Sequence, residues 1–263
     1  MKISKITTQK KNKDRYNIFI KDEYAFSVDE DVLIKYELRK GLDLSEELIS
    51  EIQAEDDLQK AYNKVINYLS YRMRSEKEVR SYLHQEEITQ TQVDRIVGRL
   101  KKSKLIDDLQ FAEMFVRSRM NTSSKGPGLI RQELQEKGIQ DEFIQEALEQ
   151  FERDVQEEKA LKLVQKRLRR RRKDSFQKQL DQARAALLRN GYPSSVINTV
   201  MDQVGSREDQ EAEWEAILNH GERLERRFKG KFTDYELQQK IKEGLYRQGF
   251  SIGIINEYLQ TRS

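Results

Sequence analysis

The sequence predicts an all-α fold: tandem three-helix repeats in an extended curved array, with a small N-terminal β-hairpin segment. Three observations predict this class. Of the 263 residues, 36% are hydrophobic and another 36% are charged, which leaves little apolar material for one large core. The chain contains only two prolines. One apolar motif also recurs along it, as in repeat proteins.

The first 55 residues differ from the rest. The stretches "RYNIFI" and "YAFSV" alternate apolar and polar residues and flank "KDE", a pattern that predicts a β-hairpin. The stretch "KISKITT" can supply a third strand. From Asp29 onward the pattern turns helical, and Gly41 and Ser45 mark a break before a long helix. We place the boundary of this segment near residue 55.

The recurring motif reads Leu, three residues, Gly, an apolar residue, four residues, Ile, three residues, then Leu or Met. It begins at Leu134, Leu187 and Leu245. The stretch from Leu83 keeps the apolar spacing but carries Glu87 in place of the glycine. The motif divides the chain after the N-terminal segment (1–55) into four helical repeats, at 56–105, 106–155, 156–205 and 206–263.

The glycine of the motif predicts the end of a helix. Helices commonly end with a left-handed residue, usually glycine because it has no Cβ, and the next residue then packs back onto the last turn. At the first glycine motif, Leu134 and Ile139 form this pair around Gly138. We expect replacement of Gly138 by alanine to cost about 1 kcal/mol.

Helix starts are marked as well. A capping residue followed three places later by Glu or Gln occurs at Ser75, Asp107, Asp174 and Thr233. Pro127 suits the first position of a helix, where its missing N–H would have no partner. The adjacent Asp107 and Asp108 could resemble paired catalytic carboxylates, but their position predicts an N-cap instead.

The stretch "LIDDLQFAEMFVRSRM" followed by "KGPGLIRQELQEKGI" resembles the middle of the RecX family, regulators of the RecA recombinase. The stretch "YLSYRMRSEKEVRSYL" matches the pattern that precedes it. The resemblance is strong from about residue 60 to 150, and afterward the helical spacing carries it. The matching residues in the middle are Asp107, Asp108, Phe111, Ala112, Val116, Arg119, Gly126, Pro127, Ile130, Glu133, Leu134, Lys137, Gly138 and Ile139.

The resemblance implies an array of three-helix repeats that lies in the groove of a RecA filament and modulates ATP hydrolysis and strand exchange. We therefore expect a regulator, and specifically an inhibitor, of RecA in recombination and DNA repair, with the RecA filament as partner. Short family members have three repeats. A core mechanism taken from them leaves the fourth repeat and the N-terminal segment of this chain unexplained.

The stretch "KLVQKRLRRRRKD" carries the most conspicuous charge. Its successive arginines are about 100° apart around a helix, so they cannot share one buried face. Either they complement the dipole at a helix C-terminus, or they contact DNA phosphates or an acidic protein surface. The segment upstream of this run is acidic, and alternating bands of charge favour a protein partner. The arginines of the run are Arg169, Arg170, Arg171 and Arg172.

Further basic residues lie where the family resemblance is strongest. They are either solvated helix faces or contacts with the partner. We take them as candidate contacts together with the arginine run: Arg72, Arg74, Arg117, Arg119, Lys125 and Arg131. The aromatic residues that recur at helical or turn positions are expected in the core instead of stacking on bases: Phe111, Phe115, Tyr192 and Phe250.

Several function classes are not supported by the sequence. The chain has no cysteine, and its two histidines, His84 and His220, are far apart and lack metal-ligand patterns, so we expect no metal site and no cofactor. Nucleotide-binding loops and nucleophile elbows are missing, so an enzyme is not expected. No run is long and apolar enough for a membrane span or a signal peptide. We expect a cytoplasmic monomer.

Direct DNA binding is the alternative function. Short helices with basic segments also occur in helix-turn-helix proteins. The net charge of +3, from 49 Lys and Arg against 46 Asp and Glu, is too small to establish a nucleic-acid partner. Binding to single- or double-stranded DNA would instead show itself by a steep salt dependence.

Overall fold

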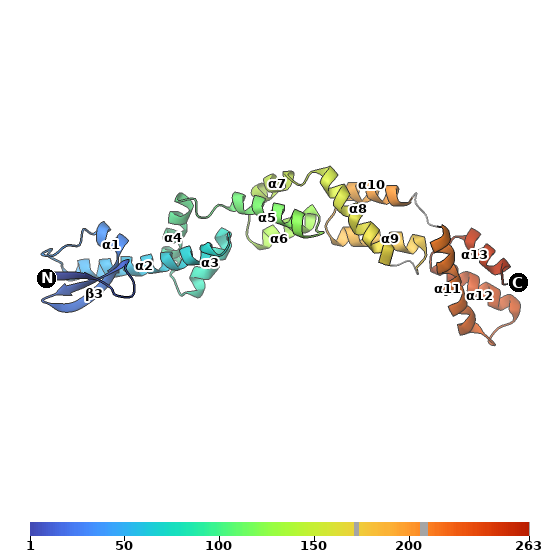
Figure 1. The fold of residues 1–263 in the computed structure, drawn as a ribbon, viewed down its shortest axis with the longest axis horizontal. Helices are drawn as coiled ribbons and strands as arrows, with labels where there is room; N and C mark the ends of the chain where they lie inside the picture. The colour runs from blue at the N-terminus through green and yellow to red at the C-terminus, as the bar shows by residue number, and fades with distance from the viewer. Residues whose placement is uncertain (171–173, 206–209, 263) are drawn as a thin grey trace. The chain divides into compact units, whose positions relative to one another are not determined.

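The computed structural model describes residues 1–170, 174–205 and 210–262 (Figure 1). The described chain is mostly helical, with a small antiparallel sheet near the N-terminus, which confirms the predicted fold class. It divides into two compact units. The first comprises Met1–Phe111 with Lys137–Ile139, and the second Ala112–Glu136 with Gln140–Ser263.

The N-terminal sheet confirms the predicted hairpin and the third strand. Strands β1 (Ile3–Thr8), β2 (Arg15–Ile20) and β3 (Glu23–Asp29) pair antiparallel in the order β1-β2-β3. The tight turn between β2 and β3 consists of Lys21 and Asp22, with φ of 53° and 61°. Two residues with positive φ make the turn whose twist matches that of the two strands.

One face of the sheet packs on helices. Ile18 and Val28 of the sheet are fully buried and share a core with Ile52 of α2. Helix α1 (Glu30–Lys35) follows β3 directly, and α2 (Glu46–Ser70) lies along the sheet. Helix α2 runs through residue 55 without a break, so the N-terminal segment and the first repeat share one helix.

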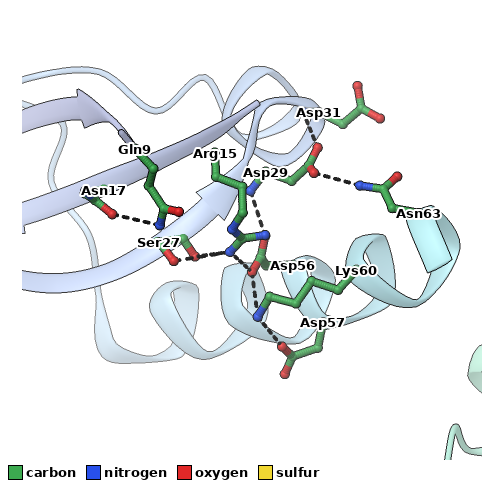
Figure 2. A network of polar contacts seen from close by, with 10 residues as sticks. All are labelled: Gln9, Arg15, Asn17, Ser27, Asp29, Asp31, Asp56, Asp57, Lys60 and Asn63. Carbon is green, nitrogen blue, oxygen red and sulfur yellow. Dashed lines mark hydrogen bonds and ion pairs between the residues drawn. The ribbon is translucent and has the colours of Figure 1, made fainter. Parts of the chain in front are cut away.

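A buried carboxylate fixes the sheet to α2. Asp56 of α2 is 2% exposed and binds the Arg15 guanidinium of β2 at 2.8 Å (Figure 2). The backbone N–H of Asp29 donates to the same carboxylate at 2.7 Å, and Lys60 pairs with it at 3.0 Å. Burial alone would raise the pKa of Asp56, but the hydrogen bonds from Arg15 and Asp29 hold it below its ordinary value. A buried charge with this many partners is costly to disrupt.

Four three-helix repeats follow from α2 onward. Each repeat consists of a first helix, a second helix that ends at the recurring turn, and a third helix. Repeat 1 contains the C-terminal part of α2, α3 (Glu76–Gln85) and α4 (Gln90–Lys102), and repeat 2 contains α5 (Asp108–Thr122), α6 (Pro127–Glu136) and α7 (Asp141–Glu149). Repeat 3 contains α8 (Arg153–Arg170), α9 (Phe176–Arg189) and α10 (Ser194–Gly205), and repeat 4 contains α11 (Gln210–Phe228), α12 (Asp234–Arg247) and α13 (Ile252–Gln260).

The glycine turns have the predicted geometry. Gly138, Gly191 and Gly249 have φ of +78°, +79° and +91°. The N–H of Tyr192, directly after the second of these turns, donates to the carbonyl oxygen of Leu187 at 3.2 Å. This is the hydrogen bond that closes a helix ending in a left-handed residue. The recurring glycine therefore ends the second helix of each repeat that contains it.

The predicted helix starts are confirmed with one correction. Ser75 and Thr233 form capping boxes, and Asp107 Oδ1 accepts a hydrogen bond from Gln110 N at 3.0 Å. Pro127 begins α6, as expected. The prediction of Asp174 as a cap is wrong, because Ser175 is the N-cap of α9. The Ser175 hydroxyl also has a partner in the next repeat, a tertiary contact that the local sequence does not reveal.

Candidate partner-binding surface

Neighbouring repeats are joined through the recurring turn. In repeat 1 the Ser75 hydroxyl, at the start of α3, donates to the carbonyl oxygen of Lys137 at 2.8 Å. In repeat 3 the Ser175 hydroxyl, at the start of α9, donates to the carbonyl oxygen of Gln248. Lys137 and Gln248 each directly precede the glycine of the next repeat's turn. The second helix of one repeat therefore begins on the turn of the following repeat.

A carboxylate from the following repeat completes each of these two junctions. The backbone N–H of Glu76 donates to Asp108 Oδ1 at 2.8 Å, and that of Phe176 donates to Glu213 Oε2 at 2.6 Å. Both amides lie at the first helical position, where a helix has no acceptor of its own. Burial raises the pKa of Asp108. Asp108 is thus a cap as predicted, although it caps α3 of the preceding repeat and not its own helix.

The junction between repeats 2 and 3 uses Gly-Pro-Gly at the same place. The N–H of Gly126 donates to Asn190 O at 2.7 Å, and that of Gly128 donates to Gly191 O at 2.9 Å. A Cβ on Gly126 would lie 2.8 Å from the backbone of Gly191. Pro127 occupies the first helical position and has no N–H, so this junction needs no capping carboxylate.

The candidate cations of repeat 1 are held beside the first junction. Glu78 accepts hydrogen bonds from Arg72 at 2.9 Å and from Lys137 at 3.0 Å. Burial by itself would raise the pKa of Glu78, but these two cations lower it to about 2. The Arg74 guanidinium lies 4.0 Å from the ring centroid of Tyr68, a cation–π contact. Both arginines therefore have partners within the chain.

The candidate cations of repeat 2 form a similar group. Glu133 of α6 binds Arg119 of α5 at 2.9 Å and also pairs with Lys125, which directly precedes the Gly-Pro-Gly turn. Arg131 lies 3.7 Å from Asp141. The structure thus brings Arg119 and Lys125 to one carboxylate and Arg131 to another. A contact with a partner protein would have to compete with these pairs or extend them.

Two predicted arginines are more accessible. Arg117 of α5 and Arg169 of α8 are exposed, and neither makes an ion pair with another described residue. Met114, one turn before Arg117, is 49% exposed. Arg170 lies within α8, but its side chain is outside the description. Arg171 and Arg172 lie outside the described residues.

Three of the four predicted core aromatics are buried, and the fourth, Phe115, is half-buried with the Arg119 guanidinium 4.7 Å from its ring centroid. Phe111, Tyr192 and Phe250 are at most 5% exposed, so they pack in the core and do not form a stacking surface. Sequence analysis did not single out Tyr71, which follows α2 and is 84% exposed, or Tyr235 at the start of α12, which is 73% exposed. Aromatic residues in such positions are common at protein interfaces. Tyr71 directly follows a first helix, and Tyr235 lies in the first turn of a second helix. This position, where the first helix gives way to the second, is the signal that could have identified both.

The described part of the chain contains neither a metal-binding cluster nor a membrane-spanning helix. No group of acidic or histidine side chains there is arranged to hold a metal ion. None of the described helices is both long and apolar enough to cross a membrane.

Models of the RecX family match most of the chain. The RecX N-terminal domain matches residues 1–45, the first three-helix domain 61–100 and the second three-helix domain 107–148. The model of the third three-helix domain matches two stretches, 154–201 and 211–259. The chain belongs to the RecX family. The double match of the third model agrees with two RecX repeats, repeats 3 and 4, in the C-terminal part.

Relatives cover nearly the whole chain. "Regulatory protein RecX" of Oceanobacillus iheyensis is 49% identical over 98% of this chain and 97% of its own length. The protein of the same name from Halalkalibacterium halodurans is 43% identical over 98% of each chain. A solved structure described as "Crystal structure of regulatory protein RecX" superposes with a TM-score of 0.72 at 41% identity, over 76% of this chain and 98% of that one. These RecX relatives are named as regulatory proteins.

Proposed function

We propose that this chain regulates a RecA-type recombinase, by binding the RecA–DNA filament and slowing its ATP hydrolysis and strand exchange. Membership of the RecX family and the regulatory name of the relatives support the regulatory role. We further propose that it acts in the cytoplasm as a monomer. The observation that carries the proposal is the junction that recurs from repeat to repeat.

A recurring junction suits a partner that is itself repetitive. The carbonyl before the turn accepts a hydrogen bond from the preceding repeat at Lys137, Asn190 and Gln248. Repeats joined by nearest-neighbour contacts can present a series of related surfaces. Contacts made by several linked repeats add up through effective concentration. Binding across adjacent recombinase subunits would hold them in one relative orientation and so slow ATP turnover.

The mixed charge of the surface favours a protein partner. Glu78 and Glu133 each join two cations beside a junction. Ion-paired side chains of both signs are suited to a protein surface that also carries both signs. A surface adapted only to DNA would present unpaired cations instead.

The proposal is tested by DNA-dependent ATP hydrolysis of a cognate RecA-type recombinase on preassembled single-stranded filaments. The chain is titrated from well below one copy per recombinase subunit. We expect a fall in rate that persists when free DNA is saturating. An unchanged rate, or an effect that excess DNA abolishes, would refute filament regulation.

A charge reversal then locates the contact. Arg117→Glu should weaken the inhibition, because Arg117 is exposed and has no ion pair among the described residues. Lys40→Glu, an equal charge change at an exposed lysine outside the candidate set, is the matched control. Equal weakening by both variants would mean that only the overall charge matters.

A second candidate function, direct binding of nucleic acid, is favoured by one separate observation. Three cations of the second unit, Lys178, Arg223 and Arg227, line one cavity.

A further inference from the structure

An open cavity of about 380 Å³ lies between α9, α11 and the end of α12 in the second unit. Its volume is within the range of ligand-binding clefts. Charged and polar side chains form most of its wall: Asp174, Lys178, His220, Arg223, Arg227 and Gln248. Three permanent cations therefore face one carboxylate, which leaves the wall net positive.

Helix α11 forms the basic side of the cavity. His220, Arg223 and Arg227 follow each other at spacings of three and four residues, which places them on one face of the helix. Arg223 and Arg227 are exposed, and neither forms an ion pair with another described residue. Their guanidinium groups are available to an anion. Arg226, between them in sequence, does not line the cavity and pairs with Glu222 at 3.4 Å.

The opposite wall holds a positioned lysine. Lys178 Nζ lies 2.7 Å from Gln248 Oε1 and 3.6 Å from Asp174 Oδ1. The junction between repeats 3 and 4 sets this arrangement, because Ser175 at the start of α9 binds the backbone of Gln248. The cavity is thus built by the contact that joins the two repeats.

Two residues of the cavity wall, Asp174 and Arg227, adjoin basic segments in the sequence. In the sequence Asp174 follows Lys173, the last residue of the basic run that begins at Arg169, and Arg227 is followed by Lys229 and Lys231. Residues 171–173 lie outside the described part of the chain.

We propose that this cavity binds a backbone phosphate of a nucleic-acid strand. Arginine guanidinium groups hold phosphate oxygens through two parallel hydrogen bonds, and the lysine adds a point charge. The side-chain amide of Gln248 can donate a further hydrogen bond. The cavity is open and larger than one phosphate group, so the adjoining sugar also has room. Contacts with phosphate oxygens carry no sequence preference.

The test measures binding of a fluorescein-labelled oligothymidylate to the full chain by fluorescence anisotropy, over a series of salt concentrations. The cavity variant is R223Q/R227Q, and R226Q is a control on the same helix. We expect the cavity variant to lose about tenfold or more in affinity and its salt slope to fall by about 1.4, since each lost single-strand phosphate contact contributes about 0.7. R226Q should change the affinity by about twofold or less.

Three outcomes would overturn the proposal: unchanged affinity in R223Q/R227Q, an unchanged salt slope, or an equal effect of R226Q and the single variant R223Q. The last would show a general effect of positive charge and no built site. Circular dichroism and thermal unfolding verify that each variant is folded. The assay contains no recombinase, so its result is independent of filament regulation.

Discussion

The turns at Glu87 and Gly191 occupy the same place in repeats 1 and 3, yet only one of them needs glycine. Both have left-handed backbone, with φ of 60° and 79°. A Cβ on Gly191 would lie 2.3 Å from the backbone nitrogen of Leu129, in the preceding repeat. Glu87 is exposed, and the segment that precedes repeat 1 is the sheet with α1. Docking of a neighbouring repeat, more than the backbone angle, therefore requires glycine.

This comparison divides the cost of a side chain at the turn into two parts. A left-handed conformation costs a residue with a Cβ about 1–2 kcal/mol. Repeat 1 tolerates that cost at Glu87. At Gly191 a side chain would also meet the backbone of the helix that docks on the turn, and backbone cannot yield as easily as the side chains of Lys77 and Ser175, which lie nearest to Gly138 and Gly249.

The largest expected effect is that of Gly191→Ala. It should destabilise repeats 2 and 3 by about 3 kcal/mol or more, because steric overlap with the Leu129 backbone adds to the left-handed strain. Hydrogen exchange is the suitable measurement, since repeats can open separately. Gly230→Ala is the matched control: Gly230 has φ +73° with no atom within 4 Å of a built Cβ, so about 1 kcal/mol is expected. Equal losses would contradict the docking explanation.

The next effect concerns the serine at a junction. Ser175→Ala should cost about 2 kcal/mol, because it removes an N-cap and leaves the Gln248 carbonyl without its partner. Thr233→Ala removes the N-cap of α12, where Thr233 is exposed, and should cost about 1 kcal/mol. Urea titration monitored by hydrogen exchange at α9 and α12 compares the two. If the alanine variants lose the same stability, the cross-repeat hydrogen bond contributes nothing measurable.

Acid should weaken the first junction through Glu78. Its folded pKa of about 2 lies below its ordinary value of 4.5, so the folded state favours the ionised carboxylate. The stabilisation is therefore fully present above about pH 4.5 and is lost as the pH falls toward 2. After allowance for solvent screening it amounts to about 1–2 kcal/mol.

Glu78→Gln tests this expectation. The variant should be less stable than the natural chain at pH 7 and should approach its stability near pH 2, as measured by hydrogen exchange in α3. A difference between the two proteins that stayed constant over this pH range would exclude the ion pairs with Arg72 and Lys137 as its cause.

The smallest effect is expected at Glu87. Glu87→Gly relieves left-handed strain but adds freedom to the unfolded chain, so a net gain of about 0.5 kcal/mol is expected. The expected change in stability is opposite in sign to that of Gly191→Ala, so the two variants together test the comparison sensitively. Thermal unfolding, monitored by hydrogen exchange in repeat 1, gives the sign of the change in stability. A clear loss of stability would mean that the Glu87 side chain has a contact of its own to maintain.

Much of the fold could be predicted from local patterns. Alternation of apolar residues identified the hairpin, and the recurring glycine motif identified the ends of the second helices. Caps were predicted where a side chain bonds its own helix, as at Ser75 and Asp107. The cap of α9 was misplaced by one residue because Asp174 has Gln177 three places later, whereas the actual cap, Ser175, is followed at that spacing by Lys178.

The candidate surface was less predictable. The sequence identified basic residues near the junctions, but it did not show that Arg72 is held by Glu78 or that Arg119 and Lys125 share Glu133. These pairs join residues of different helices, and their distances depend on how the helices pack. The cavity between α9 and α11 was missed for the same reason, since Lys178 is far from Arg223 and Arg227 along the chain.

The sequence by itself determined the helices, their ends and the repeat, because these depend on contacts between residues close together in the chain. Only the tertiary structure decided why glycine recurs at Gly138, Gly191 and Gly249 and why Glu87 can replace it in repeat 1. Each of those glycines lies against the start of a helix from another repeat. That close approach of two segments is a property of packing, which no local pattern contains.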